Sequence, residues 1–265
     1  MAVSDADPAV HSVHITRILD CRALSPESDQ VIAEQAVTIV VEYVENFTLL
    51  CTPVDLDALA IGFLFSEGLI NSADAVESIG VDPPGSVEVH LKDPPHAVQQ
   101  RNLIVSSSCG LCGTRNLKRV LHSTAPSARS LDITPEALLA AVGNLPSLQR
   151  VFKATGGAHA AAIFSQQGQV LAFGEDIGRH CALDKAIGKA LLSGLQTSGC
   201  GVALSGRVSF EMVTKAARAG IELIAAVSAP SSLAVEAAAL WNITLCGFVR
   251  RGNANIYSHP ERITA

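Results

Sequence analysis

The chain has 265 residues, of which 48% are hydrophobic and 17% are charged, and its formal net charge is −6 at pH 7. This composition is typical of a globular protein, and the length allows one large domain or two smaller ones. The negative charge argues against non-specific nucleic-acid binding, which needs clustered lysine and arginine. Because no apolar run reaches about 18 residues, we expect no membrane-spanning helix.

The N-terminal segment and the cysteines indicate where the protein works. The first 14 residues, MAVSDADPAVHSVH, lack the basic start and apolar core of an export signal. Seven cysteines at irregular spacing fit reduced thiols better than a disulfide framework. We therefore expect a cytoplasmic protein.

The first part of the chain combines strand-like runs with one helical run. Residues 35–43 and 46–51 are predicted strands, and residues 76–91 are predicted to form a hairpin around a Pro-Pro-Gly turn. Between them, residues 56–70 form a predicted helix that Gly68 ends. These elements predict a mixed α+β region.

From Thr134 the pattern changes to strands that alternate with helices. Thr134 followed by Pro135 is typical of a helix start, and residues 157–176 predict a hairpin. The later predicted helices are residues 179–192, 209–220 and 231–241, and the later predicted strands are residues 201–206, 221–229 and 243–250. The alternation predicts crossover connections and a largely parallel sheet. We divide the chain into a mixed α+β region, residues 1–130, and an α/β domain, residues 131–265.

The stretch SSSCGLCGTRNL, residues 106–117, places Cys109 and Cys112 two residues apart between glycines. A structural zinc site needs four ligands, usually two such cysteine pairs, and this chain has no second pair of cysteines with that spacing. A thioredoxin-like pair commonly opens a helix and carries an aromatic neighbour. The glycines, together with Arg115 and Lys118, favour a mobile nucleophilic thiolate. The residues alone leave these alternatives open.

Other cysteines and one histidine have simpler interpretations. Cys181, Cys200 and Cys246 stand alone in apolar runs and are predicted to be buried and inert. His159 opens a predicted strand and, taken alone, is interpreted as a histidine at a strand end. A zinc deaminase would need glutamate two residues after such a histidine, and Ala161 occupies that position. Deamination is therefore disfavoured.

Polar residues also gather at predicted strand-to-helix junctions. Residues 174–191, GEDIGRHCALDKAIGKAL, put His180 and Asp184 on one helix face. A solvated helix start explains this segment as well as a ligand site does. The junctions at residues 205–211 and 228–236 offer serines and backbone N–H groups to an anion, with Arg207 adding charge. Together with FVRRGN, they favour a phosphate-bearing ligand.

Taken together and in this order, these motifs resemble the FdhD family, the accessory sulfurtransferases required for formate dehydrogenase activity. The resemblance covers nearly the whole chain. The motifs that carry it are LDALAIGFLFSEGLI, SSSCGLCG, TGGAHAAAIF, GEDIGRHCALDKAIGKAL, SGRVSFEMVTKAARAGIELIAAVSAPSSLAVEAAAL and GFVRRGNANIYSHPERI.

The resemblance implies a sulfurtransferase in which Cys109 carries persulfide sulfur and Cys112 assists or relays it. The sulfur would come from a cysteine desulfurase. It would go to the molybdenum or tungsten of a bis-pterin guanine dinucleotide cofactor, bound as substrate and destined for formate dehydrogenase, with no structural metal. The alternative is a cofactor-binding chaperone without sulfur transfer. The family also implies a homodimer.

The resemblance further implies that the C-terminal α/β domain is similar to the cytidine deaminase fold without its zinc chemistry. Cys181 stands where the family more often has asparagine, and if that asparagine binds the cofactor, one contact is altered in this chain. The family's binding stretch and the polar junctions together predict these cofactor-binding residues: Phe248, Val249, Arg250, Arg251, Gly252, Asn253, Ser205, Gly206, Arg207, Ser228, Ser231 and His180.

Overall fold

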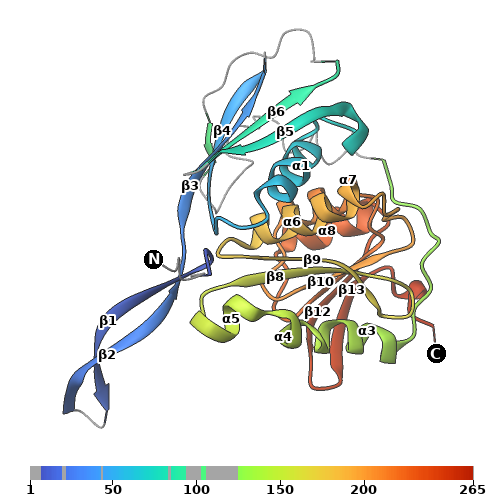
Figure 1. Cartoon of the computed structure of the whole chain (residues 1–265). Helices are drawn as coiled ribbons and strands as arrows, with labels where there is room; N and C mark the ends of the chain where they lie inside the picture. Colours follow the sequence, from blue (N-terminus) through green and yellow to red (C-terminus); the bar gives the residue numbers. More distant parts are fainter. Residues whose placement is uncertain are drawn as a thin grey trace.

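The computed structural model describes residues 7–19, 22–42, 44–82, 85–93, 103–105 and 125–264. These residues form three sheets, of two, five and six strands. The two smaller sheets lie in the N-terminal part, and the six-stranded sheet carries helices on both faces (Figure 1). The predicted α/β class is confirmed, whereas the likeness to the cytidine deaminase fold and the division near residue 130 stay predictions.

The N-terminal part begins with an antiparallel ribbon that projects away from the rest of the molecule (Figure 1). Its strands are β1 (Val10–Leu19) and β2 (Arg22–Ile32). The five-stranded sheet follows, in the order β5-β6-β3-β4-β7. Its strands are β3 (Gln35–Val41), β4 (Glu45–Cys51), β5 (Val76–Asp82), β6 (Ser86–Leu91) and β7 (Leu103–Val105). The predicted strands and the 76–91 hairpin are thus confirmed.

Helix α1 (Leu56–Glu67) joins the five-stranded sheet to the second half of the chain. Its apolar side chains Leu59 and Leu64 pack in the core of the five-stranded sheet. Gly68 ends the helix in the left-handed conformation at φ 85°, as predicted. A short 3₁₀ turn, η1 (Ala73–Ala75), then leads into β5.

The six-stranded sheet has the order β13-β12-β11-β10-β8-β9. Its strands are β8 (His159–Phe164), β9 (Val170–Asp176), β10 (Gly201–Leu204), β11 (Leu223–Ala226), β12 (Thr244–Arg250) and β13 (Asn253–Ser258). Only the β10–β11 and β11–β12 pairs are parallel. The prediction of a largely parallel sheet is therefore wrong. The reason is that β8–β9 and β12–β13 are hairpins, and a short turn permits only antiparallel pairing.

Helices cover both faces of this sheet (Figure 1). One face carries α6 (Arg179–Leu192), α7 (Phe210–Arg218) and α8 (Ser232–Leu240). The other carries α3 (Pro135–Gly143), α4 (Leu145–Leu148) and α5 (Arg150–Thr155). The chain ends after a 3₁₀ turn, η2 (Pro260–Arg262). Because both faces are covered, β10 and β11 are buried along their whole length and read as continuous apolar runs.

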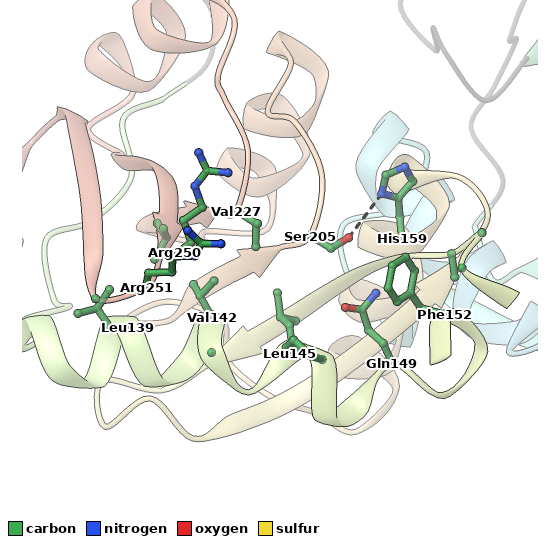
Figure 2. A pocket seen from close by; sticks show the side chains of 17 residues that line it. Leu139, Val142, Leu145, Gln149, Phe152, His159, Ser205, Val227, Arg250 and Arg251 are labelled. Atoms are coloured by element: carbon green, nitrogen blue, oxygen red, sulfur yellow. Dashed lines mark hydrogen bonds between the residues drawn. The ribbon is translucent and has the colours of Figure 1, made fainter. Parts of the chain in front are cut away.

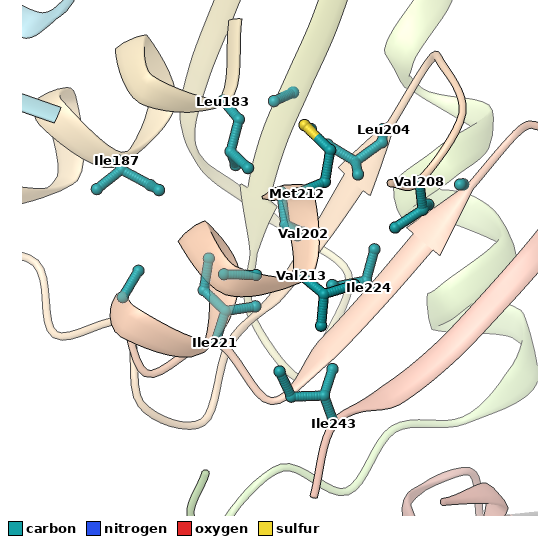
Figure 3. Packing of buried hydrophobic residues seen from close by; sticks show 14 of the residues in the cluster. Leu183, Ile187, Val202, Leu204, Val208, Met212, Val213, Ile221, Ile224 and Ile243 are labelled. Carbon is teal, nitrogen blue, oxygen red and sulfur yellow. The ribbon is translucent and has the colours of Figure 1, made fainter. Parts of the chain in front are cut away.

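The largest core lies between the sheet and α6, α7 and α8. Figure 3 shows its packing, with side chains from two of these helices and two strands. The labelled members include Leu183, Ile187, Val202, Leu204, Met212, Val213 and Ile224. Within the described ranges, no helix is long and apolar enough to cross a membrane.

The helix start predicted at Thr134 is confirmed. The Ala137 N–H donates to Thr134 Oγ1 at 3.2 Å, and Pro135 is the first helical residue. The sequence patterns did not predict β1, β2, β7, α4, α5 or β13. Of these, α4, α5 and β13 adjoin the site described below.

Candidate functional site

The candidate site lies at one edge of the six-stranded sheet. The parallel strands β10, β11 and β12 all end at this edge. Since β8 runs antiparallel to β10, its first residue, His159, lies beside the end of β10 at the same edge. This edge is where ligands commonly bind in α/β sheets.

A cavity of about 590 Å³ opens at this edge (Figure 2). Figure 2 shows Arg250 and Arg251 at one end and His159 with Phe152 at the other. Apolar side chains of α3 and α4 form one wall between the two ends. The lining residues are Leu139, Val142, Gly143, Leu145, Pro146, Gln149, Phe152, Gly156, Gly157, Ala158, His159, Ser205, Val227, Val249, Arg250, Arg251 and Gly252.

The arginine end is shaped by an irregular turn between β12 and β13. The strand register shifts between Gly247 and Arg250, and Phe248 has φ 54°. A bulky side chain rarely adopts this conformation, which costs about 1–3 kcal/mol. The bond from Phe248 N–H to Ser228 O, at 3.1 Å, holds this conformation. The bulge thereby directs Val249 and Arg250 to the cavity.

Two predicted residues support this turn without lining the cavity. The Phe248 ring packs under Arg250, whose guanidinium carbon lies 5.7 Å from the ring centroid. The Asn253 side-chain amide donates to the Arg251 carbonyl at 3.0 Å. Both side chains therefore position an arginine.

The histidine end is built by the antiparallel pairing of β8 and β10. The Ala160 N–H donates to Ser205 Oγ at 2.8 Å, and Ser205 Oγ lies 3.5 Å from His159 Nδ1. A neutral imidazole that accepts the Ser205 hydroxyl hydrogen at Nδ1 presents an Nε2–H donor.

The charges around His159 favour this neutral form. Partial burial lowers the pKa of His159 below its ordinary value, and the positive charges of Arg179 and Arg207 lower it further. At pH 7 the neutral form of the imidazole therefore predominates.

Of the twelve predicted cofactor-binding residues, five line this cavity: Ser205, Val249, Arg250, Arg251 and Gly252. Gly206 lies against the His159 ring, and the exposed Arg207 follows it. Ser228 contributes its carbonyl to the β12–β13 turn. The predicted binding stretch and the first serine junction thus meet at one site.

Ser231 and His180 do not line the cavity. Ser231 Oγ accepts from Ala234 N–H at 3.2 Å and caps α8, so its side chain is already used. His180 is buried, with its Nε2 at 3.3 Å from Glu211 Oε2. The sequence grouped these two residues with the others because all of them lie near strand-to-helix junctions.

Sequence reasoning missed the wall formed by α3, α4 and α5. Leu139, Val142, Leu145 and Phe152 were not singled out, because apolar spacing does not tell a core face from a cavity wall. The sequence interpretation of His159, taken alone, is a histidine at a strand end, and it did not include His159 among the cofactor-binding residues. The TGGAH motif that precedes β8 was the signal that could have placed it in the site.

The cysteines divide into two groups. Cys109 and Cys112 lie outside the described residues. Cys181, Cys200 and Cys246 are buried, as predicted, and so is Cys51. Burial raises the pKa of Cys246 to about 12 and is also the main cause that raises the pKa of Cys51 to about 12. In the described part of the chain, no three His, Cys, Asp or Glu side chains converge on a possible metal site.

Comparison with known proteins places the chain in a family. The model of the FdhD/NarQ family matches residues 32–264. The chain belongs to the FdhD/NarQ family. A Streptomyces avermitilis relative of this family, named sulfur carrier protein FdhD, is 40% identical, and the match covers 94% of each chain. A Saccharolobus solfataricus relative with the same name is 39% identical, with 94% of this chain and 96% of the relative covered.

A solved FdhD/NarQ-type structure has the same fold. It is the crystal structure of a putative formate dehydrogenase accessory protein from Desulfotalea psychrophila. Its TM-score is 0.80 at 25% sequence identity, and the match covers 97% of this chain and 100% of that one. The arrangement of the sheets and helices described above is therefore shared with that protein.

Proposed function

We propose that this FdhD/NarQ family member is a sulfurtransferase that serves formate dehydrogenase maturation. Cys109 accepts persulfide sulfur from a cysteine desulfurase, and Cys112 assists the transfer. The acceptor is the molybdenum or tungsten of a bis-pterin guanine dinucleotide cofactor, bound as substrate. The names of the relatives and the cysteine pair in SSSCGLCG support the sulfur step.

The observation that carries the cofactor half of the proposal is the cavity at the sheet edge. Its volume of about 590 Å³ is in the range of small-ligand sites. Two arginines at one end suit phosphate oxygens, and the Gly252 backbone between β12 and β13 lets a ligand approach closely. The apolar wall of α3 and α4 suits the flat face of a base. These features together fit a guanine nucleotide.

His159 and Ser205 add a directional donor to this cavity. In the neutral tautomer whose Nδ1 accepts from Ser205, the Nε2–H of His159 can donate to a phosphate or base oxygen without adding charge. A protonated imidazole beside Arg179 and Arg207 would be costly, since three like charges would repel one another. The two ends of the cavity therefore recognise the ligand differently, one by charge and one by a neutral hydrogen bond.

The sulfur step conserves atoms and electrons. The Cys109 thiolate attacks the outer sulfur of the desulfurase persulfide. A new S–S bond forms on Cys109, the old S–S bond breaks, and the desulfurase cysteine leaves as a thiolate. Attack of the Cys112 thiolate on the inner sulfur then releases hydrosulfide for the metal and leaves a Cys109–Cys112 disulfide. A cellular dithiol must reduce that disulfide before the next cycle.

Intact mass measurement tests the sulfur step directly. The purified protein is incubated with a cysteine desulfurase and cysteine, and its mass is taken with and without reductant. The proposal requires a gain of one sulfur that reductant removes and that Cys109→Ala abolishes. The Cys112→Ala variant serves as the matched control and should still gain the sulfur. If no form gains sulfur, the protein is not a persulfide carrier.

Nucleotide binding tests the cavity separately. Titration calorimetry with GDP should give an affinity about 10-fold to 100-fold lower for Arg250→Gln, because each charged hydrogen bond contributes about 1.5–3 kcal/mol. Arg17→Gln, on the projecting ribbon, is the matched control and should bind normally. Normal GDP binding without any sulfur gain would favour a chaperone that only holds the cofactor. Such a chaperone would also keep formate dehydrogenase active after Cys109→Ala.

The proposal also fixes the partners that the protein must meet. These are a cysteine desulfurase as sulfur donor, formate dehydrogenase as client and, for a cofactor with two guanine nucleotides, a second copy of this chain. All of this chemistry belongs in the cytoplasm, where thiols stay reduced. Size-exclusion chromatography with light scattering measures whether the chain is a dimer.

A further inference from the structure

Two arginines lie next to the histidine end of the cavity but do not line it. Arg179 is the first residue of α6, and Arg207 lies between β10 and α7. The absence of a side chain at Gly206 allows His159 and Arg179 to lie close to this residue. A Cβ at residue 206 would lie 3.1 Å from His159 Nδ1 and 3.7 Å from Arg179 Cβ. A side chain at residue 206 would therefore occupy the space between His159 and Arg179.

Within the described residues, the positive charges of Arg179 and Arg207 are only partly balanced by negative charge. Arg179 Nε is buried and donates to no group in the described part of the chain. Burial, and after it the charge of Arg207, lowers the pKa of Arg179. Glu211 attracts Arg179 through space, and its carboxylate also lies 3.3 Å from His180 Nε2. Buried polar atoms are nearly always paired in folded proteins, so an open guanidinium N–H here calls for a partner.

We propose that Arg179 and Arg207 form a second anion-binding subsite, which takes a tetrahedral oxyanion such as a phosphate group. The subsite adjoins the cavity through His159, which lies next to Gly206 and lines the cavity wall. Arg250 and Arg251 lie at the far end of the same cavity (Figure 2). A ligand that engages both arginine pairs must carry anionic groups at both ends.

This arrangement narrows the class of ligand. A mononucleotide carries its phosphates at one position only, whereas a bis-pterin guanine dinucleotide carries two separate pyrophosphates, one in each half. The subsite therefore selects an extended, polyanionic ligand over a simple nucleotide. The identification of the bound phosphate as part of the bis-pterin guanine dinucleotide cofactor rests on the proposed function. The anion subsite itself does not rest on it.

The test uses sulfate as the probe and His159 as the reporter. Sulfate is a tetrahedral oxyanion whose charge is constant across the pH range in which histidine titrates. The imidazole of His159 is followed by NMR between pH 5 and 8, in sodium sulfate and in sodium chloride at equal ionic strength. Its signal is assigned by its loss in His159→Gln. If sulfate binds between the arginines, the pKa of His159 should rise by about one unit, because the anion offsets their positive charge.

Two variants make the result specific to the pair. Arg207→Gln should raise the pKa of His159 without any sulfate and should remove the response to sulfate. Arg207 is exposed, so this change should leave the fold intact. Arg250→Gln, at the other end of the cavity, should keep the response.

The subsite is refuted if sulfate leaves the pKa of His159 unchanged in the unsubstituted protein. It is equally refuted if Arg207→Gln responds as strongly as the unsubstituted protein. The experiment contains no nucleotide, desulfurase or cofactor. A negative result with normal GDP binding and sulfur loading would therefore remove only the subsite, and a positive result would survive failure of the sulfur-transfer proposal.

Discussion

Lys215 donates to both carboxylate oxygens of Asp184, at 3.0 and 2.9 Å, and both side chains are buried between α6 and α7. One turn earlier on each helix, His180 Nε2 lies 3.3 Å from Glu211 Oε2. His180 and Asp184 do share a helix face, as the sequence indicated. That face, however, meets the matching face of α7. These polar residues thus join two helices of the core.

Asp184→Asn should destabilise the fold strongly. The change replaces the bidentate carboxylate partner of the buried Lys215 ammonium by a neutral amide and leaves Glu67, at 3.7 Å, as its remaining ion-pair partner. Breaking a buried ion pair costs about 3–5 kcal/mol, and Glu67 places this variant towards the lower end of that range. Urea denaturation measures the loss. The matched control is Lys189→Gln, which removes the half-exposed pair with Asp55 and should cost less than about 1 kcal/mol. Equal, small losses in the two variants would show that the buried pair adds little to stability.

Gly188→Ala should separate α1 from α6. A Cβ at Gly188 would lie 1.8 Å from the Ala58 carbonyl oxygen, and one at Gly62 would lie 1.8 Å from the Asp184 carbonyl oxygen. Neither backbone can move without shifting a whole helix, so we expect a loss of about 3 kcal/mol or more in the free energy of unfolding.

Gly143→Ala is the control for this experiment. Gly143 lies in α3, and nothing lies within 4 Å of a Cβ placed there. Because alanine favours a helix over glycine, this variant should keep or slightly raise the melting temperature. A normal melting temperature for Gly188→Ala would contradict the close contact of the two helices.

The four cysteines that the structure buries should resist alkylation in the folded protein. These are Cys51, Cys181, Cys200 and Cys246. Burial is the largest cause of the raised pKa of each thiol, and only the thiolate reacts rapidly. Peptide mass spectrometry after iodoacetamide treatment at pH 8 should find these four labelled only when urea is present. Rapid labelling of Cys200 or Cys246 without urea would contradict their inert role.

The perturbed pKa of His159 should make the free energy of unfolding fall as the pH is lowered below 6.5. The pKa of His159 in the folded state lies below the ordinary value of 6.5, mainly because of partial burial. The unfolded chain therefore binds the proton first, so the contribution is fully present above pH 6.5 and is lost as the pH falls below it. The free energy of unfolding should accordingly drop less between pH 7.5 and 5 in His159→Gln. Identical slopes for the two proteins would show that burial does not perturb His159.

Local sequence signals predicted much of the fold for identifiable reasons. The Thr134 cap and the Gly68 terminator act within one helical turn, so neighbouring residues are enough to recognise them. The alternation of strands and helices along the chain wrongly predicted a largely parallel sheet, because it does not show how distant strands pair. The local signals also grouped His180 and Ser231 with the cavity, because they cannot tell a residue that completes a helix contact from one that faces a ligand.

By itself, the sequence determined most of the strands and helices, the buried state of three cysteines, and the resemblance that led to the family. Only the tertiary structure decided which residues share the cavity. Ser205 and His159 meet because β8 and β10 pair antiparallel, although 46 residues separate them. Phe248 keeps its positive φ because its N–H bonds to the Ser228 carbonyl, in the bend that follows β11. Helices and turns form from contacts a few residues apart, whereas the cavity forms from pairings between distant segments.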